Sequence, residues 1–123
     1  MPKRLTDQER RWREIPEKQH QAEIIKLAEL YGWKVVHFSD SRVVNKHGQA
    51  FGDRQAAGWP DLFCIRPPEI VVIECKKELG KTTENQDEWL ALFAACGFDT
   101  YVSRPSNLDE VSARLTKSRP KSV

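Results

Sequence analysis

The sequence has few cysteines and no long apolar segment. Its three cysteines, Cys64, Cys75 and Cys96, are odd in number and lack CxxC spacing, which excludes a disulfide framework and argues against a cysteine-based zinc site. A membrane helix needs roughly 18 or more apolar residues in a row, and the charged opening of the chain is followed by no apolar stretch of the signal type. We therefore expect a cytoplasmic protein without membrane contact, in which the three thiols are buried and reduced.

The composition predicts one globular domain with basic ends. The chain has 123 residues, 39% of them hydrophobic and 31% charged, and it contains no internal repeat or linker. We expect a domain over residues 17–116, a basic extension over 1–16 and a basic tail over 117–123. The net charge of +2 is too small to indicate a polyanionic partner. The basic residues at the ends either lie on phosphates or are simply solvated: Lys3, Arg4, Arg10, Arg11, Arg13, Arg114, Lys117, Arg119 and Lys121.

Apolar periodicity and turn residues predict an order of helix, strand, loop, hairpin, helix, strand and helix. In chain order these are a helix over Glu17–Tyr31, a strand over Lys34–Phe38, a long loop over Ser39–Trp59 with room for a short strand, hairpin strands over Asp61–Arg66 and Ile70–Lys76, a helix from Thr83 to Gly97, a strand over Phe98–Val102, and a helix through Leu108, Val111 and Leu115. The second helix should bury Trp89, Leu90, Leu92, Phe93 and Cys96. A capping-box-like pair, Ser106 and Asp109, should open the last helix.

The predicted hairpin brings two carboxylates face to face. If its turn is centred between Pro67 and Pro68, antiparallel partners have residue numbers that sum to 135, and Asp61 lies opposite Glu74. Like charges directly opposed on one face of a strand pair repel each other. A purely structural hairpin would tend to avoid this arrangement, so a positive group is expected between them.

Side-chain alternation adds a lysine to the two carboxylates. Glu74 and Lys76 share one face of their strand, whereas Cys75 points to the other face and into the core. Carboxylate oxygens are the ligands that Mg²⁺ and Mn²⁺ prefer, and a lysine can position water or stabilise developing charge. The pattern therefore favours phosphodiester hydrolysis. The alternative is that Asp61 only caps the strand entry and that Glu74 and Lys76 are an ordinary solvent-facing pair on an edge strand.

Two further polar residues each allow two interpretations. Glu23 lies one helical step from Leu27, on the border of the apolar face of its helix, so its carboxylate either reaches inward or stays in solvent. Thr83 and Gln86 fit a T-x-x-Q capping box. Gln86 therefore either serves only the start of the helix or also points into the cleft.

The stretch from Gly58 to Lys76 resembles the PD-(D/E)XK nucleases, with Trp59-Pro60-Asp61 followed by Glu74-Cys75-Lys76. Glu23 in the first helix, the Gly-x-Pro-Asp and Glu-x-Lys motifs, Gln86 and Gly97 together resemble the VRR-NUC family over about Gln19 to Leu115. The two short motifs alone are a weak signal. Five features in this order and in these structural contexts are much more specific.

The resemblance implies a restriction endonuclease-like α/β/α core with a central mixed sheet flanked by helices. It implies a divalent metal, Mg²⁺ or Mn²⁺, held by Asp61, Glu74 and the backbone carbonyl of Cys75, and no organic cofactor. Lys76 would assist the attacking water. Glu23 matches the acid of the family's first helix, which binds metal directly or through water, and Gln86 matches a glutamine that helps to orient the site.

The resemblance also implies a substrate. Stand-alone members of this kind are similar to Holliday junction resolvases and often act as homodimers on branched or otherwise structured DNA, such as junctions or flaps. Two alternatives stay open: a catalytically silent nucleic-acid-binding module with the same fold, and a nuclease that acts mainly on RNA. Candidate DNA contacts outside the motifs are His37, Arg42, Arg54, Trp59 and Arg104. Each has an ordinary alternative, since single arginines are usually solvated or paired and a tryptophan beside a strand entry usually packs.

Overall fold

A computed structural model describes residues 4–38, 42–44, 50–52 and 57–117. The elements are helices α1 (Asp7–Glu14), α2 (Glu17–Leu30), α3 (Glu84–Ala95) and α4 (Leu108–Thr116), strands β1 (Lys34–His37), β2 (Arg42–Val44), β3 (Ala50–Gly52), β4 (Leu62–Arg66), β5 (Glu69–Cys75) and β6 (Asp99–Ser103), and the short 3₁₀ helix η2 (Pro105–Asn107). The predicted helix before β1, the hairpin, the helix before β6 and β6 itself are confirmed. Within the described ranges, no helix is long and apolar enough to cross a membrane.

The central sheet is mixed, as predicted. Its strand order is β1-β4-β5-β6, with antiparallel pairing of β1 with β4 and of β4 with β5, and parallel pairing of β5 with β6. The hairpin strands β4 and β5 occupy the middle. Their register is confirmed, because Leu62 pairs with Ile73 and each further pair, to Arg66 with Glu69, keeps the predicted sum.

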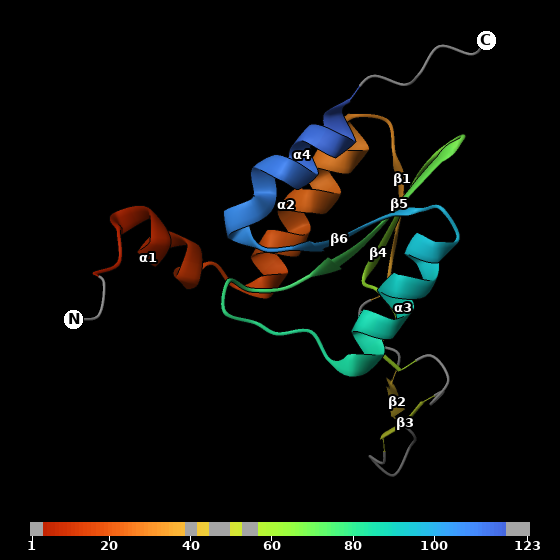
Figure 1. Cartoon of the computed structure of the whole chain (residues 1–123), viewed down its shortest axis with the longest axis horizontal. Coiled ribbons are helices and arrows are strands. Elements are labelled where there is room, and N and C mark those ends of the chain that lie inside the picture. Colours follow the sequence, from red (N-terminus) through yellow and green to blue (C-terminus); the bar gives the residue numbers. More distant parts are fainter. Residues whose placement is uncertain (1–3, 39–41, 45–49, 53–56, 118–123) are drawn as a thin grey trace.

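One face of the sheet forms the main core with α2 and α4. Leu62 and Cys64 from β4 lie with Val71, Ile73 and Cys75 from β5 in one fully buried cluster. The two helices pack against each other as well as against this face, and Figure 1 shows them together on one side of the sheet. Alternate residues of both central strands, except Arg66 and Glu69 beside the turn, thus enter a single apolar layer.

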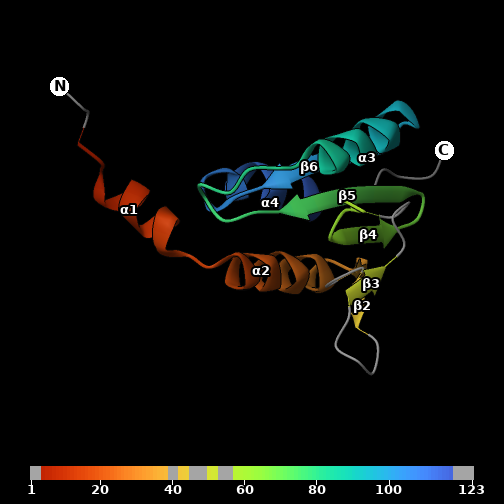
Figure 2. The same cartoon turned by 90° about the horizontal axis from the view of Figure 1, so that it is seen from below.

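The opposite face of the sheet is covered by α3. Figure 2 shows β4 and β5 between α2 on one side and α3 on the other, which confirms the predicted α/β layering. Phe63 of β4 and Phe93 of α3 meet across this second layer, with ring centroids 5.2 Å apart. The helix buries less than predicted: Leu90 is buried, but Leu92 is 52% exposed and Cys96 is also exposed. The prediction was wrong for these two residues, because α3 is the outermost layer and has the sheet on one side only.

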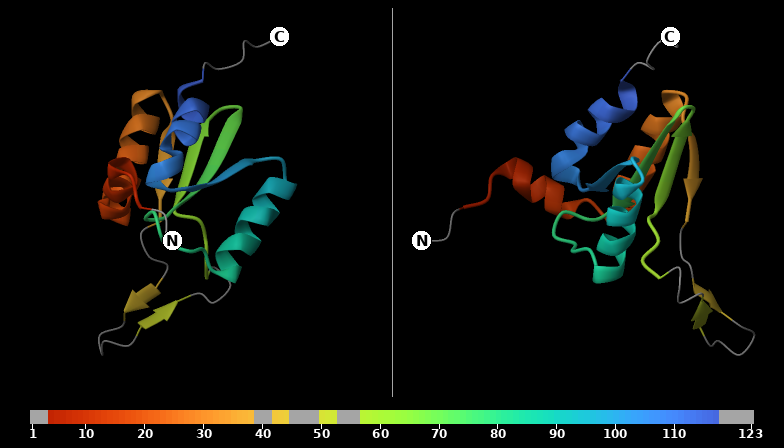
Figure 3. Two further views of the ribbon diagram at one scale, coloured as in Figure 1. Left: turned by 60° about the vertical axis from the view of Figure 1, so that its left-hand side comes forward. Right: turned by 45° about the vertical axis from the view of Figure 1, so that its right-hand side comes forward.

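The segment predicted as a long loop contains two strands rather than at most one. Strands β2 and β3 pair antiparallel as a separate two-stranded sheet, with Val43 opposite Phe51. Figure 3 shows this ribbon projecting away from the four-stranded sheet. The prediction missed the strand pair because its two strands have only three residues each, which is too short for a clear alternation pattern.

Two corrections concern helix starts. Helix α1 lies within the segment predicted as a basic extension, and a capping box opens it: Thr6 Oγ1 accepts from Glu9 N and Glu9 Oε2 accepts from Thr6 N, both at 3.0 Å. Helix α4 begins after η2 rather than at the predicted Ser106 and Asp109 pair. The side chain of Asn107 accepts a hydrogen bond from Arg104 N there and so organises the turn instead.

Candidate active site

The first carboxylate, Asp61, is held on both its backbone and its side chain. It lies just before β4, where its carbonyl oxygen accepts a hydrogen bond from Phe38 N at 2.8 Å. Its Oδ2 accepts a second bond from the backbone N of Cys75 at 3.0 Å. The carboxylate is therefore fixed against the end of β5, in the place that the hairpin register predicts.

The second carboxylate, Glu74, is buried and incompletely satisfied. Only 2% of the residue is exposed. Its Oε1 accepts a hydrogen bond from Gln86 Nε2 at 3.1 Å and lies 3.8 Å from Lys76 Nζ. Its Oε2 is buried and has no hydrogen-bond partner within the described residues. A buried carboxylate oxygen without a partner costs free energy, and a cation at this position would remove that cost.

The electrostatics of Glu74 reflect this lack of compensation. Burial and, after it, the negative charge of Asp61 together raise the pKa of Glu74 to about 8, against the opposing effect of Lys76. One lysine thus does not balance two neighbouring carboxylates, of which Glu74 is almost fully buried. Strongly shifted carboxyl groups of this kind are typical of functional sites.

Gln86 has both of the roles that the sequence allowed. Its Oε1 accepts from Thr83 N at 2.9 Å, and its own N donates to Thr83 Oγ1 at 3.2 Å, which completes the capping box of α3. The amide nitrogen of the same side chain is the donor to Glu74. One glutamine therefore joins the first turn of α3 to the carboxylate on β5.

A close backbone approach holds the motif loop against this turn. Gly58 has φ +82°, and a Cβ built there would lie 2.6 Å from Asn85 Cβ and 2.7 Å from Gln86 N. The indole of Trp89 also donates to the carbonyl of Ala57 at 3.0 Å. Only glycine fits at this position without displacing the start of α3.

A buried polar pair on the other face of the sheet was not predicted. His20 of α2 is 1% exposed, and its Nε2 lies 2.8 Å from Ser103 Oγ at the end of β6. The carbonyl of Ser103 in turn accepts from Lys76 N at 2.9 Å. Burial lowers the pKa of His20. The two residues are far apart in the sequence, and the only local signal was a histidine one helical step from the buried Ile24.

The remaining predicted residues lie outside this arrangement. Glu23 is exposed on α2, and the described part of the chain holds no group of three or more His, Cys, Asp and Glu side chains that could bind a metal. His37 is exposed at the end of β1. Trp59 packs among aromatic rings, with Trp89 4.7 Å away, and the guanidinium of Arg104 donates to the carbonyl of Gly80.

Two predicted DNA contacts cannot be placed. Arg42 begins β2, but its side chain is outside the described part of the structure, and Arg54 lies outside the described residues altogether.

The comparison with known families decides the class of this site. The sequence model of the VRR-NUC domain matches residues 4–107, a range that includes both carboxylates, the lysine and the glutamine. The chain belongs to the VRR-NUC domain family. No curated protein and no solved structure matches it. The VRR-NUC domain gives the chain a nuclease-type function on DNA.

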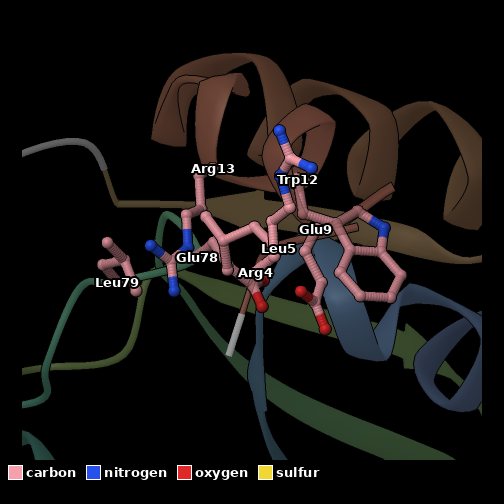
Figure 4. Close-up of a pocket in the computed structure, with 7 residues that line it drawn as sticks. All are labelled: Arg4, Leu5, Glu9, Trp12, Arg13, Glu78 and Leu79. Atoms are coloured by element: carbon pink, nitrogen blue, oxygen red, sulfur yellow. The ribbon is translucent and has the colours of Figure 1, made fainter. Parts of the chain in front are cut away.

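The VRR-NUC domain also has a pocket of about 320 Å³ between α1 and the segment that follows Lys76. Figure 4 shows its lining residues, Arg4, Leu5, Glu9, Trp12, Arg13, Glu78 and Leu79. Its two arginines are balanced by two acids. Glu9 accepts from Thr6 N and Glu78 accepts from Ser106 N, so both acids are occupied in holding local structure. The balanced charges do not make this pocket a strong anion site.

Proposed function

We propose that this chain is a metal-dependent endonuclease that hydrolyses phosphodiester bonds in DNA. The observation that carries the proposal is the buried Glu74, whose pKa is raised to about 8 beside Asp61 and whose Oε2 lacks a partner in the described structure. Burying two carboxylates with a single lysine is unfavourable in a purely structural role. A divalent cation bound to them would turn this cost into a favourable interaction.

The donor set fits Mg²⁺ or Mn²⁺. Asp61, Glu74 and the backbone carbonyl of Cys75 would hold the ion, since hard cations of this size accept one or two carboxylates and leave other positions to water and phosphate. When bound, the ion supplies polarisation of the phosphoryl oxygen and a lower pKa for an attacking water. Glu23 is exposed on α2, outside this arrangement, so its part in metal binding, directly or through a water molecule, rests on the family resemblance alone.

The other residues of the site would position the reacting groups and stabilise developing charge. Lys76 shares the face of Glu74 and would orient the attacking water and stabilise negative charge as it develops on the phosphate. Gln86 would keep Glu74 turned toward the ion through its 3.1 Å hydrogen bond. Partners of this kind, one step removed from the metal, typically change affinity or activity about 10- to 100-fold when they are lost.

For the substrate, we propose branched or structured DNA, such as Holliday junctions or flaps, cut by a homodimer. The support is the resemblance of the Gly58–Lys76 and Gln86 motifs to stand-alone members of the family. A dimer would place two sites across one branched molecule.

The test is cleavage of labelled duplex, single-stranded, flap and four-way junction DNA, with a matched RNA, in Mg²⁺, Mn²⁺ or EDTA. Lys76→Ala should lower cleavage by about 100-fold or more, because a charge that acts in the transition state is lost. Lys77→Ala is the matched control, since Lys77 is the exposed neighbour and should be dispensable. Full cleavage by Lys76→Ala would contradict the assignment. Binding without cleavage of any substrate would favour a catalytically silent module.

A further inference from the structure

An aromatic residue lies in the same row as the two carboxylates. The pairing of His37 with Leu62 continues by one residue, because Phe38 N donates to the carbonyl of Asp61 at 2.8 Å. Extending the register of β4 and β5 by one pair beyond Leu62 and Ile73 puts Asp61 opposite Glu74. Paired residues on neighbouring strands share a face, so Phe38, Asp61 and Glu74 form one row on the face that α3 covers. Adjacent strands are about 4.8 Å apart, which places Phe38 next to Asp61 in this row.

The ring of Phe38 packs against two other aromatic rings but stays partly exposed to solvent. Its centroid lies 6.1 Å from that of Trp59 and 5.9 Å from that of Phe63, both in edge-to-face geometry. Trp59 and Phe63 are themselves stacked, with centroids 5.3 Å apart. Phe38 nevertheless remains 44% exposed. The cluster therefore holds a partly open aromatic ring in place beside the catalytic carboxylates.

We propose that Phe38 stacks against an unpaired base of the DNA strand whose phosphate enters the site. The inference rests on the proposed function, because it places the scissile phosphate at Asp61 and Glu74. Stacking on an aromatic ring tolerates every base, since each has a π face. A base inside a continuous duplex is already stacked on its neighbours and would have to leave them first. Phe38 therefore selects strands with an unpaired nucleotide next to the cut, as at flaps, forks and junctions.

The position of the ring favours a base over a protein partner. A second copy of the chain seated on Phe38 would also cover Asp61, its direct neighbour in the row, and would close the site to DNA. A nucleotide instead presents its phosphate and its base to adjacent parts of this row. Single exposed apolar residues are common on protein surfaces, but this one is joined to the backbone carbonyl of Asp61 by a hydrogen bond from its own N.

The experiment measures binding without cleavage. The full chain is titrated in EDTA against a labelled single-stranded oligonucleotide and a labelled fork, by fluorescence anisotropy, and each DNA carries one abasic residue at successive positions. Wild type should lose affinity about 5-fold or more when one particular base is missing. Phe38→Ala should bind intact DNA more weakly by the same factor and should be insensitive to that abasic position. Phe38→Leu should behave likewise, and Phe38→Tyr should restore the wild-type pattern.

Val36→Ala is the matched control. Val36 lies two residues along β1 on the same face, is 37% exposed, and should leave the abasic profile unchanged. The proposal is overturned if Phe38→Ala keeps wild-type affinity, or if it weakens binding to every abasic DNA by the same factor. It is also overturned if sedimentation shows that Phe38→Ala converts a dimer to a monomer. Because no cleavage is measured, a protein that fails the nuclease assay can still show this profile, and a working nuclease can lack it.

Discussion

Replacing Gly58 with alanine would test how closely the motif loop must approach α3. The new Cβ would lie 2.6 Å from Asn85 Cβ, and ordinary contact begins at 3.4 Å, so the start of α3 would have to move by about 0.8 Å. The 3.1 Å hydrogen bond from Gln86 to Glu74 would then stretch beyond its normal range. Left-handed backbone costs a residue with a Cβ about 1–2 kcal/mol, and overpacking adds about 1–3 kcal/mol.

We therefore expect Gly58→Ala to lose about 2–5 kcal/mol in free energy of unfolding. Cleavage should fall by about 100-fold, since displacements of about 1 Å can have that effect. Urea denaturation followed by circular dichroism gives the stability, and initial cleavage rates well below the transition give the activity. Measuring both separates a displaced site from an unfolded chain.

Gly97→Ala is the control for the backbone conformation alone. Gly97 has φ +92°, but a Cβ there would meet nothing within 4 Å. This variant should lose only about 1–2 kcal/mol and should keep its cleavage rate. If Gly58→Ala and Gly97→Ala are equally stable and equally active, the close approach to α3 has no role in the site and the reasoning is refuted.

Two further predictions concern the carboxylate on β5. The folded chain holds the Glu74 proton more tightly than the unfolded chain does. In EDTA, the free energy of unfolding of wild type should therefore fall as pH rises from about 4.5 to about 8, whereas that of Glu74→Gln should not show this fall. Urea denaturation at several pH values in this range measures the difference, and Glu88→Gln, at an exposed glutamate, is the control. If wild type and Glu74→Gln show the same dependence of stability on pH, the pKa of Glu74 is not shifted. Gln86→Glu keeps an acceptor for Thr83 N but replaces the amide donor to Glu74. It should lose about 1–3 kcal/mol in free energy of unfolding, because it removes the donor to a buried oxygen and adds a third carboxylate beside it. It should also cleave about 10- to 100-fold more slowly, and unchanged cleavage would confine Gln86 to its capping role.

The central hairpin could be predicted because its signal is local. Alternation along β4 and β5 and a turn at Pro67 determine which residues face each other, and the observed pairing of Leu62 with Ile73 follows that count. The site residues on these strands inherit the same register. Asp61 and Glu74 therefore meet as expected, and the structure adds the Cys75 N to Asp61 bond that holds them in place.

Features that depend on distant parts of the chain could not be predicted. The His20 and Ser103 pair joins α2 to β6 across most of the sequence, and no periodicity reports such a contact. Whether Leu92 is covered depends on how many layers pack on α3, which the pattern of one helix does not reveal. Helix α1 is a different case, because Thr6 and Glu9 form a recognisable capping box. The basic residues around it led to its interpretation as a basic extension, with no helix assigned to it.

Because side chains alternate along β4 and β5, correct pairing of these strands assembles the core and the candidate site together. Leu62 and Ile73 enter the core from the same two strands that carry Asp61 and Glu74 on the other face. A slip of one residue in the pairing would turn each shifted side chain to the wrong face, so it would expose the core and separate the carboxylates together. A copy of the chain that misfolds in this way has no assembled site with which to damage DNA.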